Sequence, residues 1–219
     1  SRYIGGEVNT IKKDLTGVSL TFGFAFPDAY EVGMSHLGLQ ILYQVLNSRP
    51  DIACERVFAP WSDMEALLRK KGVPLSTLES GIPLNKLHIL GFSLQYELSY
   101  TNVLNMLDLG GIPLYSKDRA KDDAIVIGGG PASYNPEPVA EFFDAFLLGD
   151  GEAAVLEISD AVIEGRRSGE DRREILMRLS RIEGVYVPAF FDVNYNPDGT
   201  VKEIVPLIEG YTRVTRRVV

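Results

Sequence analysis

The chain has very few thiol and imidazole side chains. Its 219 residues include one cysteine, Cys54, and two histidines, His36 and His88. A single cysteine excludes a disulfide framework, and it also excludes a thiolate cluster for zinc or an iron–sulfur centre. Cys54 lies in the apolar stretch 52–58, which is typical of a buried strand thiol. Chemistry that needs several thiolates is therefore excluded for this chain.

The chain also lacks an excess of positive charge and any long apolar run. Its net charge is −8 and its isoelectric point is about 4.9, whereas nucleic-acid binding needs a basic patch. No run approaches the roughly 20 apolar residues that span a bilayer, and no signal peptide opens the sequence. We expect a cytoplasmic protein with neither a nucleic-acid partner nor a membrane partner.

The length of the chain favours one domain with additions at both ends. We expect an N-terminal extension (1–17), a main domain (18–165) and a C-terminal segment (166–219). The sequence lacks an initiator methionine, and residues 213–217 do not form a closing element. These ends indicate an N-terminal fragment of a longer protein.

Five apolar runs alternate with helical patterns in the main domain. The runs are residues 19–26, 53–58, 87–94, 124–127 and 144–148, and the main helical patterns are 36–47, 62–71, 100–109 and 152–163. Such alternation is typical of a parallel sheet with right-handed crossover helices. The sequence therefore predicts an α/β fold, a flavodoxin-like doubly wound parallel sheet of five strands, with the suggested order 2-1-3-4-5.

The pattern changes after residue 165. A charged stretch (166–173) precedes a helical pattern at 173–181. Residues 184–191 and 201–206 are then apolar and flank an Asn-Pro-Asp-Gly turn at 196–199, which is typical of a hairpin. We expect a small C-terminal α+β appendage made of one helix and one hairpin.

Four loops that follow predicted strands share an unusual composition. Residues 27–35, 93–101, 128–136 and 149–152 combine glycine or small polar residues with few bulky aliphatic ones. The carboxyl ends of parallel strands meet at one edge, where open sheets bind ligands. A glycine after a strand often serves only a tight turn, but four such loops at one edge favour a binding crevice.

The glycine run 128–130 restricts the classes of ligand that the crevice is expected to bind. It has the spacing of neither the dinucleotide fingerprint nor a phosphate-binding loop, which argues against nucleotide hydrolysis and against a flavin or nucleotide site. Three glycines after a buried strand suit a planar cofactor or a closely packed partner. Three tyrosines, Tyr96, Tyr100 and Tyr134, are expected at the same rim, where they either stack on a ring system or cover the edge of the core.

Several carboxylates fall near this edge. They are Asp28, Glu31, Glu97, Glu137, Asp150 and Glu152. Such groups can form acid–base pairs or metal sites, but Asp150 and Glu152 also suit a helix N-terminus, where the macrodipole stabilises negative charge. No nucleophile–histidine pair has a recognisable context. We expect no catalytic residue and no metal ligand within this chain.

The loop residues resemble those of the cobalamin-binding domain family. That family has Asp-x-His-x-x-Gly after the first strand, Ser-x-Leu after the third and Gly-Gly after the fourth. This chain has DAYEVG at 28–33, SLQ at 93–95 and GGG at 128–130, and the resemblance covers about residues 18–165. Two departures stand out, because Tyr30 replaces the histidine and Gln95 replaces the leucine.

More specifically, the chain resembles the N-terminal part of radical S-adenosylmethionine (SAM) proteins that carry a cobalamin-binding-like domain. The residues that carry this resemblance are 2–7 (RYIGGE), 27–35 (PDAYEVGMS), 55–61 (ERVFAPW), 91–97 (GFSLQYE), 129–131 (GGP), 135–138 (NPEP) and 149–152 (GDGE). The resemblance implies a following barrel domain as partner, which holds a 4Fe–4S cluster and SAM. Cys54 alone cannot supply the three-cysteine motif of that barrel, so this chain alone is not expected to be catalytic.

The resemblance implies cobalamin as the cofactor and names its contact residues. These are Asp28, Tyr30, Gly33, Ser93, Gly129 and Gly130. A phenol, with an ordinary pKa of about 10, is a poor ligand for cobalt at neutral pH. Tyr30 therefore fits a corrinoid bound without a histidine ligand to cobalt. It fits equally a non-catalytic interaction module that kept the fold and lost the cofactor, and the substrate, reaction and oligomeric state are not indicated.

Overall fold

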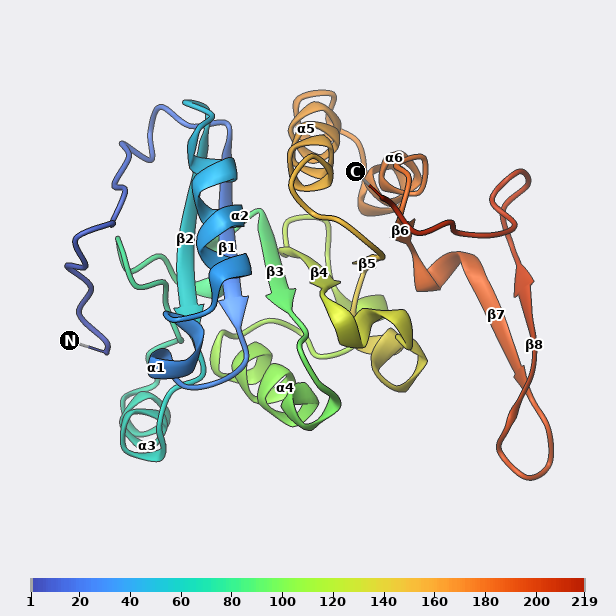
Figure 1. Cartoon of the computed structure of the whole chain (residues 1–219), viewed down its shortest axis with the longest axis horizontal. Coiled ribbons are helices and arrows are strands. Elements are labelled where there is room, and N and C mark those ends of the chain that lie inside the picture. The colour runs from blue at the N-terminus through green and yellow to red at the C-terminus, as the bar shows by residue number, and fades with distance from the viewer. Residues whose placement is uncertain (1, 219) are drawn as a thin grey trace.

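The computed structural model describes residues 2–218, which form a mixed α/β structure around one six-stranded sheet (Figure 1). The strands of this sheet are β1 (Leu20–Phe26), β2 (Ile52–Phe58), β3 (Ile89–Ser93), β4 (Ile125–Gly129), β5 (Ala145–Leu147) and β6 (Val185–Tyr186). Their order is β2-β1-β3-β4-β5-β6; the first five are parallel, and β6 is antiparallel to β5. The parallel strands follow the order expected from the sequence.

The sixth strand corrects the prediction of a five-stranded sheet. Only two residues form β6, and Tyr186 and Val185 pair with Phe146 and Leu147 of β5. A strand this short has no readable periodicity, so its pairing comes from the tertiary structure. The sheet is therefore mostly parallel with one antiparallel edge strand.

Six helices surround the sheet. They are α1 (Tyr30–Gly33), α2 (Leu37–Asn47), α3 (Ser62–Lys71), α4 (Tyr100–Leu109), α5 (Ala154–Arg167) and α6 (Arg172–Leu179). Helices α2, α5 and α6 share one hydrophobic core with one face of the sheet, and α4 belongs to the core on the other face. The sequence predicted α3 and α4 to the residue, but it missed α1, which is a single turn within the first loop.

The edge strand β2 is covered by two neighbouring segments. The Leu78 backbone N–H donates to the Arg56 carbonyl at 2.8 Å, and the Glu79 carboxylate accepts from the Arg56 N–H at 2.7 Å. The N-terminal segment runs along the same side (Figure 1), where Lys13 Nζ donates to the carbonyls of Asn47 and Ile52. These contacts satisfy backbone groups that an open edge would expose.

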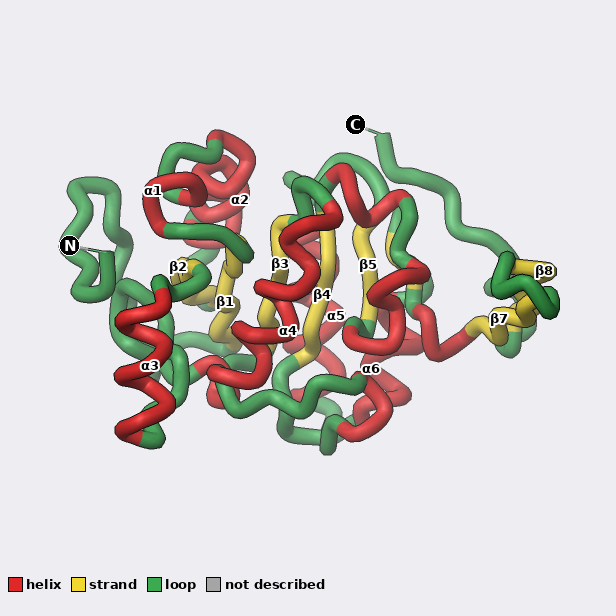
Figure 2. The backbone as a smooth tube through the Cα atoms, turned by 90° about the horizontal axis from the view of Figure 1, so that it is seen from below, coloured by secondary structure: helices red, strands yellow, loops and turns green. Residues whose placement is uncertain are grey.

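The first strand of the C-terminal hairpin lies later in the sequence than predicted, whereas the second strand, 201–206, is confirmed to the residue. The hairpin consists of β7 (Phe191–Tyr195) and β8 (Val201–Pro206), whereas residues 185–186 join the main sheet. The prediction that 184–191 forms one hairpin strand is wrong, because Pro188 begins a 3-10 turn that divides this run. The hairpin projects from the body (Figure 2), and every residue of β8 is exposed.

Helix α6 packs into the main core rather than standing apart with the hairpin. Ile175, Leu176 and Leu179 are buried in the core that also contains α5. Its N-terminus is closed by a capping box between Asp171 and Glu174. Within the described residues, no helix is long and apolar enough to cross a membrane.

Candidate functional site

Two cavities of similar size lie at the carboxyl edge of the sheet. The first, which we call the glycine cavity, has a volume of about 190 Å³ and lies between the sheet and helices α2 and α5. Its walls include Phe22, His36, Ser93, Gly129, Gly130 and Gly151. The second, which we call the strap cavity, has a volume of about 200 Å³ and lies beside the end of β2. Its walls include Tyr3, Tyr30, Phe58, Trp61 and Met64.

The structure divides the six residues that the sequence singled out. Ser93, Gly129 and Gly130 all line the glycine cavity. Tyr30 lines the strap cavity. Asp28 and Gly33 are in neither lining, although both belong to the loop between the two. The motif therefore contributes to two distinct places at one sheet edge.

The glycine cavity exists because small residues end the central strands. Ser93 of β3 pairs with Gly129 of β4, and residues paired across a sheet share a face. The residues two positions earlier, Gly91 and Ile127, pair on the same face. On strand β4 the face thus changes from the large Ile127 to Gly129, and at its carboxyl end the face carries only hydrogen and hydroxymethyl side chains. The volume beneath α2 and α5 is left unfilled there.

Each of the three consecutive glycines, 128 to 130, has different surroundings, so the presence of glycine has a different explanation at each position. A Cβ at Gly128 would meet the Phe146 ring at 2.7 Å, so this glycine serves packing on the opposite face. Gly130 has φ +106° and a Cβ there would lie 2.7 Å from the Leu94 carbonyl, so it serves the turn. A Cβ at Gly129 would meet only Leu147, at 3.9 Å, and its φ is ordinary. The protein's own packing does not require glycine at position 129.

A pair of polar side chains occupies the wall beside these glycines. Gln95 Nε2 donates to Ser93 Oγ at 2.8 Å, and the same amide nitrogen lies 3.2 Å from the place of a Cβ on Gly130. The Ser93 hydroxyl still has its proton to donate, and Gln95 Oε1 is a further acceptor. Gln95, which departs from the family motif, thus has a defined place in the wall. The remaining surface of the cavity is mainly apolar.

Asp28 links two loops at the rim. Its Oδ1 accepts from the Ala29 backbone N–H at 2.7 Å, and its Oδ2 accepts from the Tyr96 hydroxyl at 2.9 Å. This second hydrogen bond raises the pKa of Tyr96. The aspartate therefore joins the loop after β1 to the loop after β3, as the convergence of parallel strand ends requires.

Tyr30 is hydrogen-bonded to the N-terminal segment. Its hydroxyl donates to Glu7 Oε1 at 2.6 Å, and its ring packs edge-on against Phe58 with centroids 5.5 Å apart. The hydrogen bond to the carboxylate and the partial burial raise the pKa of Tyr30 to about 12. The phenol is therefore protonated at neutral pH and already has a partner, so it has no tendency to bind a metal as phenolate.

Gly33 is explained by packing alone. A Cβ at this position would lie 2.4 Å from the Phe58 ring and 3.1 Å from Phe26 Cβ. Distances of this size exclude any side chain without movement of β1, β2 or α1. The glycine of the motif thus allows α1 to pack closely on the two strands.

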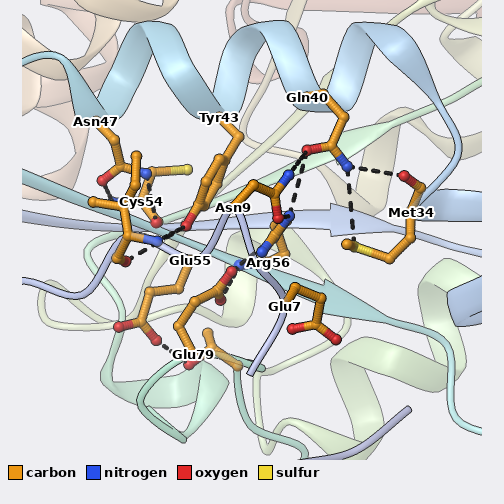
Figure 3. Close-up of polar contacts among 12 residues, drawn as sticks. Glu7, Asn9, Met34, Gln40, Tyr43, Asn47, Cys54, Glu55, Arg56 and Glu79 are labelled. Atoms are coloured by element: carbon orange, nitrogen blue, oxygen red, sulfur yellow. Dashed lines mark hydrogen bonds and ion pairs between the residues drawn. The ribbon is translucent and has the colours of Figure 1, made fainter. Parts of the chain in front are cut away.

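A buried ion pair joins strand β2 to the segment that covers its edge, close in sequence to residues that line the strap cavity. Arg56 and Glu79 are fully buried, and Arg56 Nε donates to Glu79 Oε1 at 2.6 Å. Figure 3 shows this pair beneath α2, with the guanidinium carbon 4.3 Å from the ring centroid of Tyr43. Burial raises the pKa of Glu79. Nothing in the sequence marked this pair, because charged residues in a short edge strand normally face solvent.

The carboxylates near the edge do not gather into a metal site. Within residues 2–218, no group of three or more histidine, cysteine, aspartate or glutamate side chains could hold a metal ion. Glu137 accepts a hydrogen bond from the Tyr186 hydroxyl at 2.7 Å, which fastens β6 to the body. Cys54 is a buried free thiol on β2, as expected, and burial raises its pKa.

The sequence missed residues that line the glycine cavity from elements outside the motif loops. Phe22 comes from the middle of β1 and His36 from the start of α2, whereas Gly151 belongs to the loop 149–152 that the sequence had indicated. The period-two alternation of β1 and β3 could have placed Phe22 and Gly91 on the same face as Ser93. His36 had no such signal, because helix N-caps rarely reveal which cavity they face.

Comparisons with known proteins give one family and one structure. The model of the family described as radical SAM proteins, N-terminal, matches residues 38–188, which is more than half of the chain. A search of curated proteins found no match. The chain is similar to the structure of the radical SAM methyltransferase TsrM from Kitasatospora setae, with 14% identity and a TM-score of 0.45. That similarity covers 85% of this chain, which spans only 30% of the TsrM chain.

The match to the family model contains most of the elements around the glycine cavity, whereas strand β1 and His36, which also line it, precede the matched range. It extends from the first turn of α2 through β3, β4, β5 and α5 to the end of β6. The fold described above and this match agree on one assignment. The chain belongs to the family of N-terminal domains of radical SAM proteins.

Proposed function

We propose that this chain is the cobalamin-binding module of a radical SAM enzyme, built on a flavodoxin-like sheet. It would hold a corrinoid at the carboxyl edge, without a histidine ligand to cobalt, over the iron–sulfur and SAM centre of a following barrel domain. A bound corrinoid supplies a cobalt centre for group-transfer or radical chemistry. The residues of this chain bind and orient it.

One observation carries the proposal. Gly129 lies at the end of β4, has ordinary backbone angles, and has room for a side chain, because a Cβ there would make only an ordinary contact with Leu147 at 3.9 Å. A strand interior is destabilised by glycine, so a residue with a Cβ would serve the fold better. A ligand that must approach the backbone closely explains the absence of a side chain.

The lining fits the nucleotide end of a corrinoid. The volume of about 190 Å³ suits a fused aromatic base and is too small for the whole macrocycle. The walls are apolar apart from the Ser93–Gln95 pair and His36, and such walls with few polar groups are typical of ligand sites. Ser93, Gly129 and Gly130 would contact this end, while Asp28, Tyr30 and Gly33 shape the rim.

The test is a titration of the chain with hydroxocobalamin, followed by its visible spectrum. We expect saturable binding by the native chain and at least a tenfold loss in Gly129→Val, because the valine fills the cavity. Gly17→Val is the matched control, since Gly17 is exposed and has room for a Cβ far from the cavity. Absence of saturable binding at high micromolar concentration would leave the alternative, an interaction module that lost its cofactor.

A further inference from the structure

His36 stands at the wall of the glycine cavity and also closes the N-terminus of α2. Its Nδ1 accepts a hydrogen bond from the Leu39 backbone N–H at 3.2 Å. A ring nitrogen that accepts carries the lone pair, so in the neutral imidazole the proton is on Nε2. The capping bond thus determines the tautomer, and Nε2–H becomes a donor.

The ring is held in place from two sides. It packs against Phe26 with ring centroids 5.1 Å apart. A Cβ at residue 38 would lie 3.0 Å from His36 Cε1, so Gly38 allows the ring to lie close to the first turn of the helix. No hydrogen bond joins Nε2 to another residue within 2–218, although Nδ1 has its partner. His36, a residue of this mainly apolar wall, therefore has a fixed ring whose Nε2 has no hydrogen-bond partner among the described residues.

We propose that His36 is a specificity residue of the glycine cavity, whose Nε2–H donates to an acceptor atom on the nucleotide end of the bound corrinoid. This inference rests on the proposed function. The Ser93–Gln95 pair provides polar atoms from β3, and His36 provides one from α2. A base held between apolar walls is thereby oriented from two different elements. The acceptor must be a ring nitrogen or an oxygen of the attached ribose or phosphate.

The variant His36→Asn separates the two roles of the residue. Asparagine is a strong N-cap residue, so its side-chain oxygen still accepts from the N–H of residue 39. Its short amide does not reproduce the Nε2–H of the histidine. His36→Ala removes both roles and reports the cost of the lost cap. Thermal unfolding should therefore be unchanged in His36→Asn and lowered in His36→Ala.

Binding is measured with two probes that differ in the nucleotide end. Hydroxocobalamin carries this end, and cobinamide lacks it. We expect His36→Asn to weaken cobalamin binding about fivefold, the effect of one hydrogen bond, and to leave cobinamide binding unchanged. Equal cobalamin affinity in the native chain and His36→Asn overturns the role of His36 while the proposed function stands. Absence of cobalamin binding by the native chain overturns both.

The tautomer is tested without any ligand. A long-range ¹⁵N–¹H correlation spectrum of the chain gives the protonated nitrogen of each histidine, and His36→Asn identifies the signal of residue 36. We expect the proton on Nε2. A proton on Nδ1 would show that the capping bond does not exist and would overturn the inference on its own.

Discussion

The two cavities at the carboxyl edge have similar volumes but opposite construction. The glycine cavity is bounded by small residues at strand ends, and one of them, Gly129, has room for a Cβ in ordinary contact with Leu147. The strap cavity is walled by Tyr30, Phe58 and Trp61 and by Arg2 and Tyr3 of the N-terminal segment, which is hydrogen-bonded to Tyr30 through Glu7. The difference shows that residues of one motif can leave space in a cavity at one place and serve internal packing at another.

The largest loss of stability is expected when the buried ion pair between Arg56 and Glu79 is broken. Glu79→Ala leaves the buried guanidinium of Arg56 without a counter-charge and its backbone N–H without an acceptor. Breaking a buried pair in this way costs about 3–5 kcal/mol of unfolding free energy. Urea denaturation measures the loss, and Glu164→Ala is the control because its ion pair with Arg178 is exposed. A loss no larger than that of the control would contradict a supporting role for the pair.

The next prediction compares the stability effects of substituting two glycines of the family motif, Gly33 and Gly129. Gly33→Ala forces a Cβ against the Phe58 ring and should destabilise the chain by about 1–3 kcal/mol through overpacking. Gly129→Ala places its Cβ in ordinary contact with Leu147, without a clash, and should be neutral or slightly stabilising, because alanine restricts the unfolded chain. The denaturation midpoints of the two variants, each compared with that of the native chain, measure the two changes in stability. Similar losses in both would remove the distinction between a packing glycine and a ligand glycine.

The smallest loss of stability is expected when the Tyr30 hydroxyl is removed. Tyr30→Phe removes its hydrogen bond to Glu7 and should cost about 1 kcal/mol at neutral pH. Because the folded pKa of about 12 lies above the ordinary value of about 10, the folded state holds this proton more tightly. The contribution is therefore complete below pH 10 and is lost as the pH rises toward 12.

The measurement for Tyr30 is the difference in stability between the native chain and Tyr30→Phe as a function of pH. Tyr134→Phe is the control, since Tyr134 is exposed. Tyr30→Phe should bind hydroxocobalamin with the same affinity as the native chain. A loss of corrinoid affinity as large as that of Gly129→Val would place Tyr30 in the same site and erase the contrast between the two cavities.

Local patterns were enough to predict most of the fold. The apolar runs and helical periods located five parallel strands, and the bounds of α3 and α4 agree with the sequence to the residue. Strand β6 and the start of the hairpin were mistaken, because a two-residue strand carries no pattern and Pro188 divides an apolar run. Pairing of such short pieces depends on neighbours distant in sequence.

The candidate site was predictable only in part. Sequence order brought Ser93, Gly129 and Gly130 to one sheet edge, because parallel strands end together. It could not show that Tyr30 donates to Glu7, or that His36 faces the same cavity as Ser93. Those relations depend on how α1, α2 and the N-terminal segment pack on the sheet.

The sequence by itself therefore predicted the family, the parallel strands and the sheet edge at which the motif loops meet, and it suggested the strand order without fixing it. Period-two and helical alternation are local properties, and the family residues are a linear pattern. The tertiary structure alone decided which glycine has room for a Cβ, which side chains line the same cavity and which residue accepts the hydrogen bond of Tyr30. These are properties of side-chain packing between elements, where a difference of one ångström separates open space from a clash.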